Sequence, residues 1–541
     1  MKTKLLLLSL AFVSTVLAGN STWSSNPLTN DWNTATNWVP NQVPDSPDDT
    51  AIFDLSALTS LSVSQDIDVG ALTFDVGASA YTITPAAGVT MTISGAGISN
   101  QSGVTQTFVL PGDSDIGITF TGSAKAGTMT LFSNHTGVLS FPGGVTFNGT
   151  SSADHATIIN EGAADESSID AGVNTFNDNS NVENATIINN AGLHGGGETL
   201  FQFTSTAGNS TIICNSGTAP MMRGGVVSMG GTGQYGGNAT ITVNGSDVAQ
   251  SGGGLLDVFD HASTGNATLI ANGGALDPGH LQFQPAGSGG TSRVELFGNG
   301  SLDILYPAGE PPLTIGSLEG DGSVFLDAAN LMIGGNGLST IFSGVIADEG
   351  GGGSITKVGA GTLTLSGANT YTGGTVVRGG TLLVNNTTGS ATGTGLVKVA
   401  NATLAGSGTL AGPVTMQNGG LLTPSAGAKF KTTLTIQGLL TLSSTSTYTY
   451  TFKANKNQAH TDLVIANGAA IKNAILNLSG QTNGSLTFGL TLTVISNTSA
   501  SPISGTFSNL PEGAIVTVNG NNLQANYEGG DGNDLTLTVV P

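Results

Sequence analysis

The chain has 541 residues, 82 of them glycine, and carries a formal net charge of −22 at pH 7. A chain this acidic repels phosphate groups, which argues against DNA or RNA as a partner. The glycines follow no three-residue register, which excludes collagen. Hydrophobic residues make up 38% of the chain and fall in short β-branched runs, which excludes a disordered polypeptide.

Residues 1–18 have the pattern of a secretory signal peptide. Lys2 and Lys4 precede an apolar run, and small residues close the segment at Ala18. We therefore expect an exported protein, secreted or held at the cell surface, whose mature chain starts near Gly19. We expect no membrane-spanning segment in that mature chain, because no later apolar run has the necessary length.

Residues 19–54 differ in composition from the rest of the chain. They contain all three tryptophans, and they end in a stretch rich in proline and aspartate. We expect an N-terminal cap that covers the open strand edge of the first coil. Two alternatives stay open. The tryptophan rings could instead be exposed and stack on sugars, and a group of aspartates could bind Ca²⁺ rather than form turns, namely Asp45, Asp48, Asp49 and Asp54.

Residues 55–412 are predicted to form a parallel β-helix. Apolar and polar residues alternate up to Phe147, which is the pattern of strands with one buried face. Between residues 147 and 301 a five-residue phrase then recurs, and its threonines are 29, 25, 29 and 28 residues apart, at Thr157, Thr186, Thr211, Thr240 and Thr268. A period of this length indicates one unit stacked on copies of itself, and the units show no helical pattern. The prediction is an all-β solenoid.

Several side chains recur at fixed places in these repeats. Four phenylalanines are expected to stack inside the solenoid, namely Phe147, Phe176, Phe201 and Phe259. Four asparagines are expected to form an amide ladder along a corner, namely Asn184, Asn209, Asn238 and Asn266. Asp154 and Glu183 place like charges on neighbouring coils, and they either point apart into solvent or form a weak cation site. Cys214, the single cysteine, is expected to be buried.

Residues 355–385 carry the most specific motif in the chain. The segment resembles the autotransporter-associated β-strand repeat, and the matching positions are Lys357, Gly359, Gly361, Thr362, Leu363, Leu365, Ser366, Gly367, Asn369, Tyr371, Gly373, Gly374 and Thr375. The resemblance implies a right-handed parallel β-helix that is exported and passenger-like, of a kind associated with adhesion. It implies no catalytic residue within the motif, and it places Asn369 and Tyr371 at corner and core positions.

Residues 413–541 are expected to form closing coils and a β-rich C-terminal cap. Autotransporters end in a translocator barrel, and the chain departs from that pattern, because this segment lacks the expected strand count and aromatic girdles. The stretch Gly529 to Asp534 matches one copy of a calcium-binding nonapeptide. We expect a tight turn there, since such sites need tandem copies.

The sequence shows no arrangement of residues typical of an active site. A polysaccharide lyase or hydrolase on a β-helix needs acids aligned on neighbouring coils, together with a basic residue. Only Asp154 and Glu183 align, and the Asp260–His261 pair is expected in a solvated loop. No arginine aligns with an acidic cluster, and the histidines lack metal-ligand spacing. We therefore predict no catalytic, cofactor-binding or metal-binding residue.

The favoured function is that of a structural, adhesion-like solenoid outside the cell. Its outer face, rich in threonine, asparagine and serine, would contact an extracellular surface or a polysaccharide, and self-association stays open. The alternative is a polysaccharide-active β-helix enzyme, either a lyase or a glycoside hydrolase.

Overall fold

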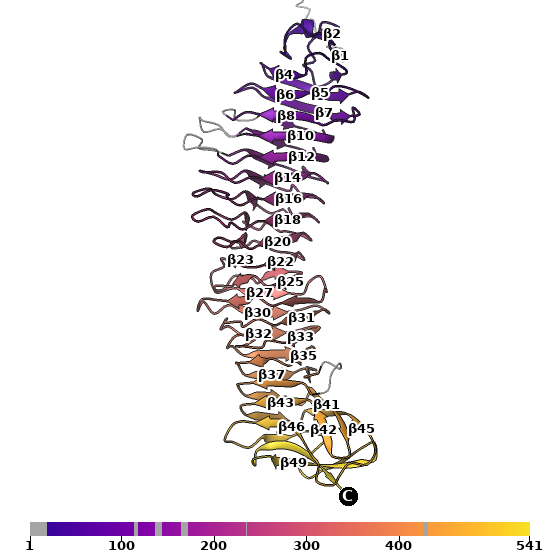
Figure 1. The fold of residues 1–541 in the computed structure, drawn as a ribbon, viewed down its shortest axis with the longest axis vertical. Helices are drawn as coiled ribbons and strands as arrows, with labels where there is room; N and C mark the ends of the chain where they lie inside the picture. The colour runs from indigo at the N-terminus through magenta and orange to yellow at the C-terminus, as the bar shows by residue number, and fades with distance from the viewer. Residues whose placement is uncertain (1–18, 113–116, 136–142, 164–170, 234, 426–430) are drawn as a thin grey trace, which may run out of the picture.

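The protein is a long rod of stacked β-coils (Figure 1). The computed structural model describes residues 19–112, 117–135, 143–163, 171–233, 235–425 and 431–541. These residues form about 16 turns of a parallel β-solenoid. Their only helical element is the three-residue 3-10 helix η1 (Ala35–Asn37). The predicted all-β solenoid is confirmed, whereas the predicted signal peptide lies outside the described residues.

Sheet 1 runs along the N-terminal part of the rod and has 15 strands among the described residues. In spatial order they are β2 (Trp38–Val39), β1 (Asn20–Trp23), β3 (Thr50–Phe53), β5 (Ile67–Phe74), β7 (Met91–Asn100), β9 (Ile118–Phe120), β11 (Gly144–Phe147), β13 (Val173–Phe176), β15 (Glu198–Phe201), β17 (Val226–Gly230), β19 (Leu255–Phe259), β21 (His280–Phe283), β23 (Ser301–Ile304), β26 (Ser323–Phe325) and β29 (Val345–Ala347). All neighbours are parallel except β1 and β2.

Sheet 2 faces sheet 1 across the lumen and continues further toward the C-terminus. Its strands are β4 (Ser60–Val63), β6 (Thr82–Pro85), β8 (Gln106–Leu110), β10 (Thr128–Asn134), β12 (His155–Asn160), β14 (Thr186–Asn189), β16 (Thr211–Cys214), β18 (Thr240–Val243), β20 (Thr268–Asn272), β22 (Arg293–Phe297), β25 (Ser317–Gly320), β28 (Thr340–Phe342), β31 (Thr362–Leu365), β33 (Thr381–Val384), β35 (Thr403–Gly406), β38 (Leu421–Thr423), β41 (Thr447–Asn455) and β45 (Ile475–Thr482), with β42 (Gln458–Thr461) pairing antiparallel to β41.

Two further sheets occur in the C-terminal half. Sheet 3 contains β24 (Leu313–Ile315), β27 (Asn330–Ile333), β30 (Ser354–Lys357), β32 (Thr375–Val377), β34 (Val397–Ala400), β37 (Val414–Gln417), β40 (Leu440–Leu442), β44 (Ala469–Lys472) and β47 (Ser504–Thr506). Sheet 4 contains β36 (Thr409–Leu410), β39 (Thr433–Ile436), β43 (Leu463–Ala466), β46 (Thr491–Asn497), β50 (Asp534–Val540), β49 (Asn521–Gly529) and β48 (Ile515–Val518).

The recurring phrase of the sequence sets the register of sheet 2. Its threonines pair one with the next on successive strands β12, β14, β16, β18 and β20, as predicted. Each strand alternates buried and partly exposed residues, so that every second side chain enters the lumen. Like residues therefore lie directly above one another.

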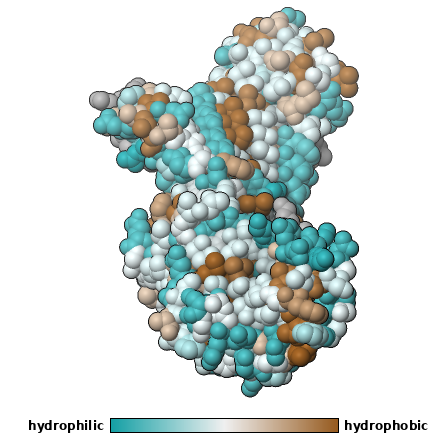
Figure 2. Space-filling view, turned by 60° about the horizontal axis from the view of Figure 1, so that its bottom comes forward, coloured by the Kyte–Doolittle hydropathy of each residue, from teal (hydrophilic) through white to brown (hydrophobic). Residues whose placement is uncertain are grey.

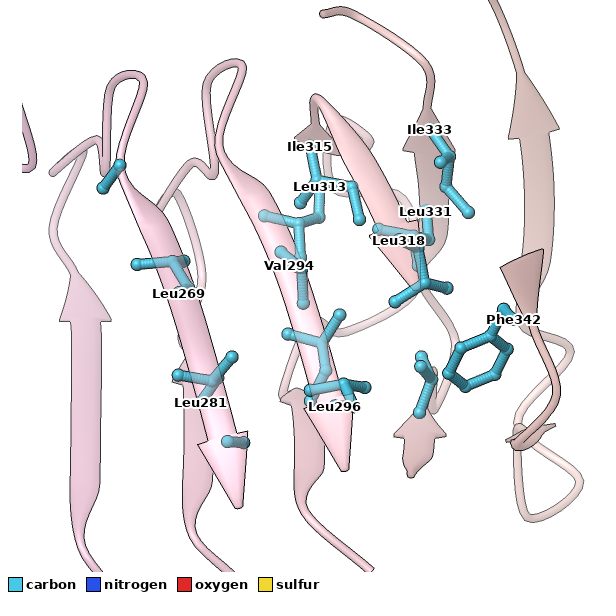
Figure 3. Packing of buried hydrophobic residues seen from close by; sticks show 14 of the residues in the cluster. Leu269, Leu281, Val294, Leu296, Leu313, Ile315, Leu318, Leu331, Ile333 and Phe342 are labelled. Atoms are coloured by element: carbon cyan, nitrogen blue, oxygen red, sulfur yellow. The ribbon is translucent and has the colours of Figure 1, made fainter. Parts of the chain in front are cut away.

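The lumen is filled by aliphatic and aromatic side chains. Figure 3 shows leucine, isoleucine and valine side chains from neighbouring coils pointing toward one another, among them Leu281, Val294 and Leu296. Nearer the N-terminus the rings of Phe120, Phe147 and Phe176 stack in near-parallel planes, with centroids 4.9 Å and 4.7 Å apart. The predicted phenylalanine stack is confirmed for three of its four members, since Phe201 continues it at 5.4 Å.

The prediction for Phe259 is wrong. The lumen positions that follow Phe201 in register are Met229, Val258 and Phe283, so Phe259 is one residue out of phase. Because side chains alternate along a strand, a shift of one residue places the Phe259 ring on the outer face.

The N-terminal cap buries all three tryptophans. Trp23, Trp32 and Trp38 are at most 1% exposed, and each indole N–H donates to a backbone carbonyl. Their rings meet edge to face, with Trp38 at 5.1 Å and 4.8 Å from the other two. The alternative in which these rings stack on sugars is therefore wrong, because their faces are covered by protein.

Three of the four aspartates singled out in residues 19–54 accept hydrogen bonds from backbone amides. Asp49 accepts from the amides of Gly19 and Asp45, at 2.8 Å and 3.1 Å. Asp45 accepts from the amide of Asp68, and Asp54 from that of Leu55. Within the described ranges no group of three or more His, Cys, Asp or Glu side chains is placed to hold a metal ion.

At the C-terminal end the strands turn antiparallel, which closes the stack. β50 pairs with both β46 and β49, and β48 pairs with β49. Gly529 and Asp534 face each other across the β49–β50 turn, and Asp534 accepts from the amide of Asn497 at 2.8 Å. The predicted tight turn is confirmed.

Three amide ladders run along the repeats, where the sequence predicted one. The predicted ladder is exposed and is confirmed for Asn209, Asn238 and Asn266, which are linked at 3.2 Å and 3.3 Å. A second, partly buried ladder links Asn190, Asn215, Asn244 and Asn272 at 2.9 to 3.2 Å. A third is buried and links Asn134, Asn160 and Asn189, both bonds being 2.6 Å. It ends beside Cys214, which is buried as predicted, and burial raises the pKa of that thiol to about 12.

Candidate functional site

The outer face of sheet 1, between β15 and β23, gathers polar side chains in one row. Ser228, Asp257, Gln282 and Asp303 lie in register on four successive strands. The Asp257 carboxylate accepts from the side-chain amide of Gln282 at 3.2 Å and from that of Gln284 at 2.8 and 2.9 Å. We call Ser228, Asp257, Gln282 and Asp303 the polar row. It presents about one polar group per coil, at the roughly 4.8 Å spacing of neighbouring strands.

His280 lies beside the polar row and is held by two acids. Its Nδ1 is 2.9 Å from a carboxylate oxygen of Asp303, and its Nε2 is 3.7 Å from one of Asp277. The hydroxyl of Ser301 is also 2.9 Å from Nδ1. Serine and aspartate thus meet the same ring nitrogen, whereas in a catalytic triad the serine hydroxyl and the orienting acid meet opposite nitrogens of the histidine ring.

The hydrogen bond to Asp303 raises the pKa of His280, and burial opposes it in part. Because the pKa is higher in the folded than in the unfolded protein, the protonated form of His280 stabilises the folded state. This contribution is fully present below the unfolded pKa of about 6.5. That contribution is lost as the pH rises through the pKa of the folded protein. We expect an NMR titration of the full chain to show His280 titrating above 6.5.

In the same titration, Asp303→Asn should lower the pKa of His280 more than Asp277→Asn does, because the Asp303 hydrogen bond is the largest cause of the shift. The His280→Gln variant assigns the signal. Equal effects of the two aspartate variants would contradict the assignment of Asp303 as the main partner.

An apolar hollow of about 450 Å³ opens on the same face, and Ser228 of the polar row lies on its rim. Its volume falls in the range of roughly 300–1,000 Å³ typical of small-ligand pockets. We call it the aromatic groove and define it by Leu200, Phe203, Gly230, Gly231, Phe259 and Asp260. Phe203 is 62% exposed, and Gln202, Ser228 and Thr232 form a polar rim.

Glycine at position 230 makes room for the aromatic ring of the next coil. A Cβ atom on Gly230 would lie 2.4 Å from the Phe259 ring, so any other residue would displace that ring. Gly230 and Phe259 face each other in register on β17 and β19. The ring therefore lies across the bare backbone and forms one side of the groove.

Phe203 stands at a corner with left-handed backbone conformation, φ 58°. The corners on the coils before it carry Gly149 and Asp178 with similar φ values, and a later one carries Asp260. Such a conformation suits glycine, asparagine and aspartate, and it is costly for a bulky side chain. The Tyr235 hydroxyl lies 2.8 Å from the Phe203 carbonyl oxygen and 2.7 Å from that of Gly230, which holds this corner in place. Burial raises the pKa of Tyr235, so the hydroxyl keeps its proton.

The pair Asp154 and Glu183 does not form a shared acidic site. Asp154 accepts from His155 at 2.7 Å, and Glu183 pairs with Lys125 at 3.3 Å. Each acid thus has its own basic partner rather than pointing freely into solvent. Both residues occupy left-handed corners, at φ 52° and 55°.

The expectation that no arginine aligns with an acidic cluster is wrong. Glu295 and Glu319 lie in register on β22 and β25, and Arg293 binds both carboxylates, the first at 3.0 Å. The spacing between these coils departs from the repeat, which hid the alignment in the sequence. All three side chains are partly exposed, so the cluster is a surface ion-pair network that contributes little stability. Asp260 and His261 form a loose, exposed pair at 3.6 Å, as predicted.

The residues of the 355–385 motif build parts of two successive coils, in which β32 and β33 stack on β30 and β31. Asn369 accepts from the Ile346 amide at 2.8 Å and donates to the Ala391 carbonyl at 2.6 Å, so it links three coils. Tyr371 is fully buried, with its hydroxyl 2.6 Å from that of Thr375. Both positions are as predicted. Lys357 is also buried, which lowers its pKa, and its ammonium group donates to three backbone carbonyls.

Comparison with known proteins supports the motif. The family model described as passenger-associated-transport-repeat matches residues 355–384. Over an alignment of 244 positions, the chain is 30% identical to the adhesin BmaC autotransporter of Brucella suis. The protein is autotransporter passenger-like.

The passenger-like chain matches only a small part of that relative. The aligned segment covers 37% of this chain and 7% of the length of the Brucella protein. The crystal structure of the Haemophilus influenzae Hap adhesin aligns with 91% of this chain and with 64% of the Hap chain. The sequence identity is 13%, and the TM-score is 0.29. Among the described residues of the passenger-like chain, no helix has the length and apolar content needed to cross a bilayer.

Proposed function

We propose that this passenger-like chain is exported and acts outside the cell as an adhesin-like rod. The observation that carries the proposal is the passenger-associated repeat, whose strands stack on one another as two successive coils of a continuous solenoid. The similarity to an autotransporter adhesin supports the same role.

The surface of the rod suits contact over a long distance. Charged residues make up only 9% of the chain, and threonine and serine occupy many of the outward positions of the strands. Figure 2 shows apolar patches that are small and separated by neutral and hydrophilic areas. A stiff surface of repeated polar groups can make many weak contacts at once, and linking these contacts raises the overall binding affinity.

Purified full-length chain is expected to bind in a saturable way to whole cells or to immobilised extracellular matrix. The matched control is the same chain unfolded in urea and diluted immediately before the assay, because the proposed contacts depend on the register of the coils. Absence of binding to every surface above that control would refute the proposal. Release of reducing or unsaturated sugar ends from a polysaccharide surface would favour the enzyme instead.

A further inference from the structure

The aromatic groove combines two features that recognise sugars. The rings of Phe203 and Phe259 offer apolar faces, and side chains that can bind hydroxyl groups surround them, among them Gln202 and Asp260. A pyranose ring has the complementary chemistry, since C–H bonds cover its faces and hydroxyl groups line its edge. Aromatic faces carry negative charge density that attracts such C–H bonds.

The backbone conformation at Phe203 supports a binding role for its ring. The fold needs a left-handed residue at this corner, and glycine or aspartate meets that need on other coils, at Gly149, Asp178 and Asp260. Asp178 also bonds the Gly149 amide at 2.9 Å, a contact that phenylalanine cannot make. The ring is therefore held exposed, at 62%, where the corner itself would favour another residue.

The polar row continues from the groove along the axis of the rod. Ser228 belongs to both, and Asp257, Gln282 and Asp303 follow on the next three coils. A linear ligand whose ring rests in the groove would meet a new hydrogen-bonding group at each coil. This direction favours a polymer over a single sugar.

The charge of the site selects against anionic polymers. Asp260 lies in the groove, Asp257 and Asp303 belong to the polar row, and Glu198 bonds Ser228 at 2.7 Å. The whole chain has a net charge of −22. Carboxylates accept hydrogen bonds from neutral hydroxyl groups but repel uronate and sulfate groups.

We propose that the aromatic groove is a binding subsite for an uncharged polysaccharide, with one pyranose ring against Phe203 and Phe259 and the following sugars along the polar row. The proposal rests on the proposed extracellular binding role and names the ligand class for one part of the surface.

The test is affinity electrophoresis of the full chain in gels that contain dextran, mannan or a mixed-linkage β-glucan, with alginate as the anionic comparison. At least one neutral polymer is expected to retard the wild-type protein, and alginate is not. Phe203→Asn should weaken the apparent Kd about tenfold or more. Asparagine tolerates the left-handed corner, so this variant is expected to fold at least as well as the wild type.

The control is Phe488→Asn, which removes an equally exposed ring, 68% exposed, outside the groove. It should leave retardation unchanged. Binding of none of the neutral polymers, or equal binding by Phe203→Asn, overturns the proposal.

Other occupants give different results. Wild-type dimers in sedimentation velocity that Phe203→Asn dissolves would assign the groove to a second copy and overturn the glycan proposal. If Phe203→Asn loses no adherence in the cell assay and no glycan is bound, the groove proposal fails while the adhesin-like role stands. If the wild type adheres to nothing, the proposed function itself fails.

Discussion

Phe176→Ala is expected to lower the free energy of unfolding by about 3–5 kcal/mol. Phe176 is fully buried, and its ring stacks between those of Phe147 and Phe201 at 4.7 Å and 5.4 Å. Truncation removes both contacts and leaves a cavity in the lumen, which neighbouring coils cannot fill without breaking their backbone ladders. Urea unfolding followed by far-UV circular dichroism measures the loss.

Phe259→Ala is the matched control, because the sequence placed Phe259 in the same stack but its ring lies on the outer face. This variant should lower the free energy of unfolding by less than about 1 kcal/mol. All three tryptophans lie in the N-terminal cap, so tryptophan fluorescence in the same titration reports the unfolding of that end alone. Equal losses for the two variants would contradict the outward placement of Phe259.

Asn160→Ala is expected to lower the free energy of unfolding by about 3 kcal/mol. The substitution leaves several buried polar groups without partners, and each such group costs about 1–3 kcal/mol. The Asn160 side chain accepts from Asn134, and its amide nitrogen lies within hydrogen-bonding distance of Asn189, Asn174 and, at 2.9 Å, the Glu198 carbonyl oxygen. Water cannot replace these bonds inside the lumen. The midpoint of thermal unfolding should fall accordingly.

Asn238→Ala tests whether an amide ladder stabilises only where it is buried. Asn238 also bonds an asparagine of each neighbouring coil, but on the surface. Asn238→Ala should lower the free energy of unfolding by no more than about 0.5 kcal/mol, since water satisfies the remaining amides. A cost for Asn238→Ala close to that of Asn160→Ala would show that burial is not the deciding factor.

The proposed binding surface was only partly predictable. The sequence indicated an extended outer face rich in small polar residues, but neither the aromatic groove nor the polar row. The groove joins Phe203, Gly230 and Phe259, which come from three coils and meet only after stacking. Two signals were present in the sequence. One was the phenylalanine that interrupts the glycine and aspartate corners at 203, and the other was Gly230 at a strand end.

The amino-acid sequence by itself determined the parallel stack of coils, because a recurring β-branched phrase can bury its apolar face only against copies of itself. The resemblance of residues 355–385 to a known repeat also placed Asn369 and Tyr371 correctly, whereas the sequence left open whether the tryptophans are buried. Only the tertiary structure decided whether Phe259 points into the lumen or to the outer face. The same holds for the acids that Arg293 bridges and for the side chains that form the aromatic groove. These depend on register, and coils of unequal length shift the register between strands. A shift of one residue moves a side chain from the lumen to the outer surface.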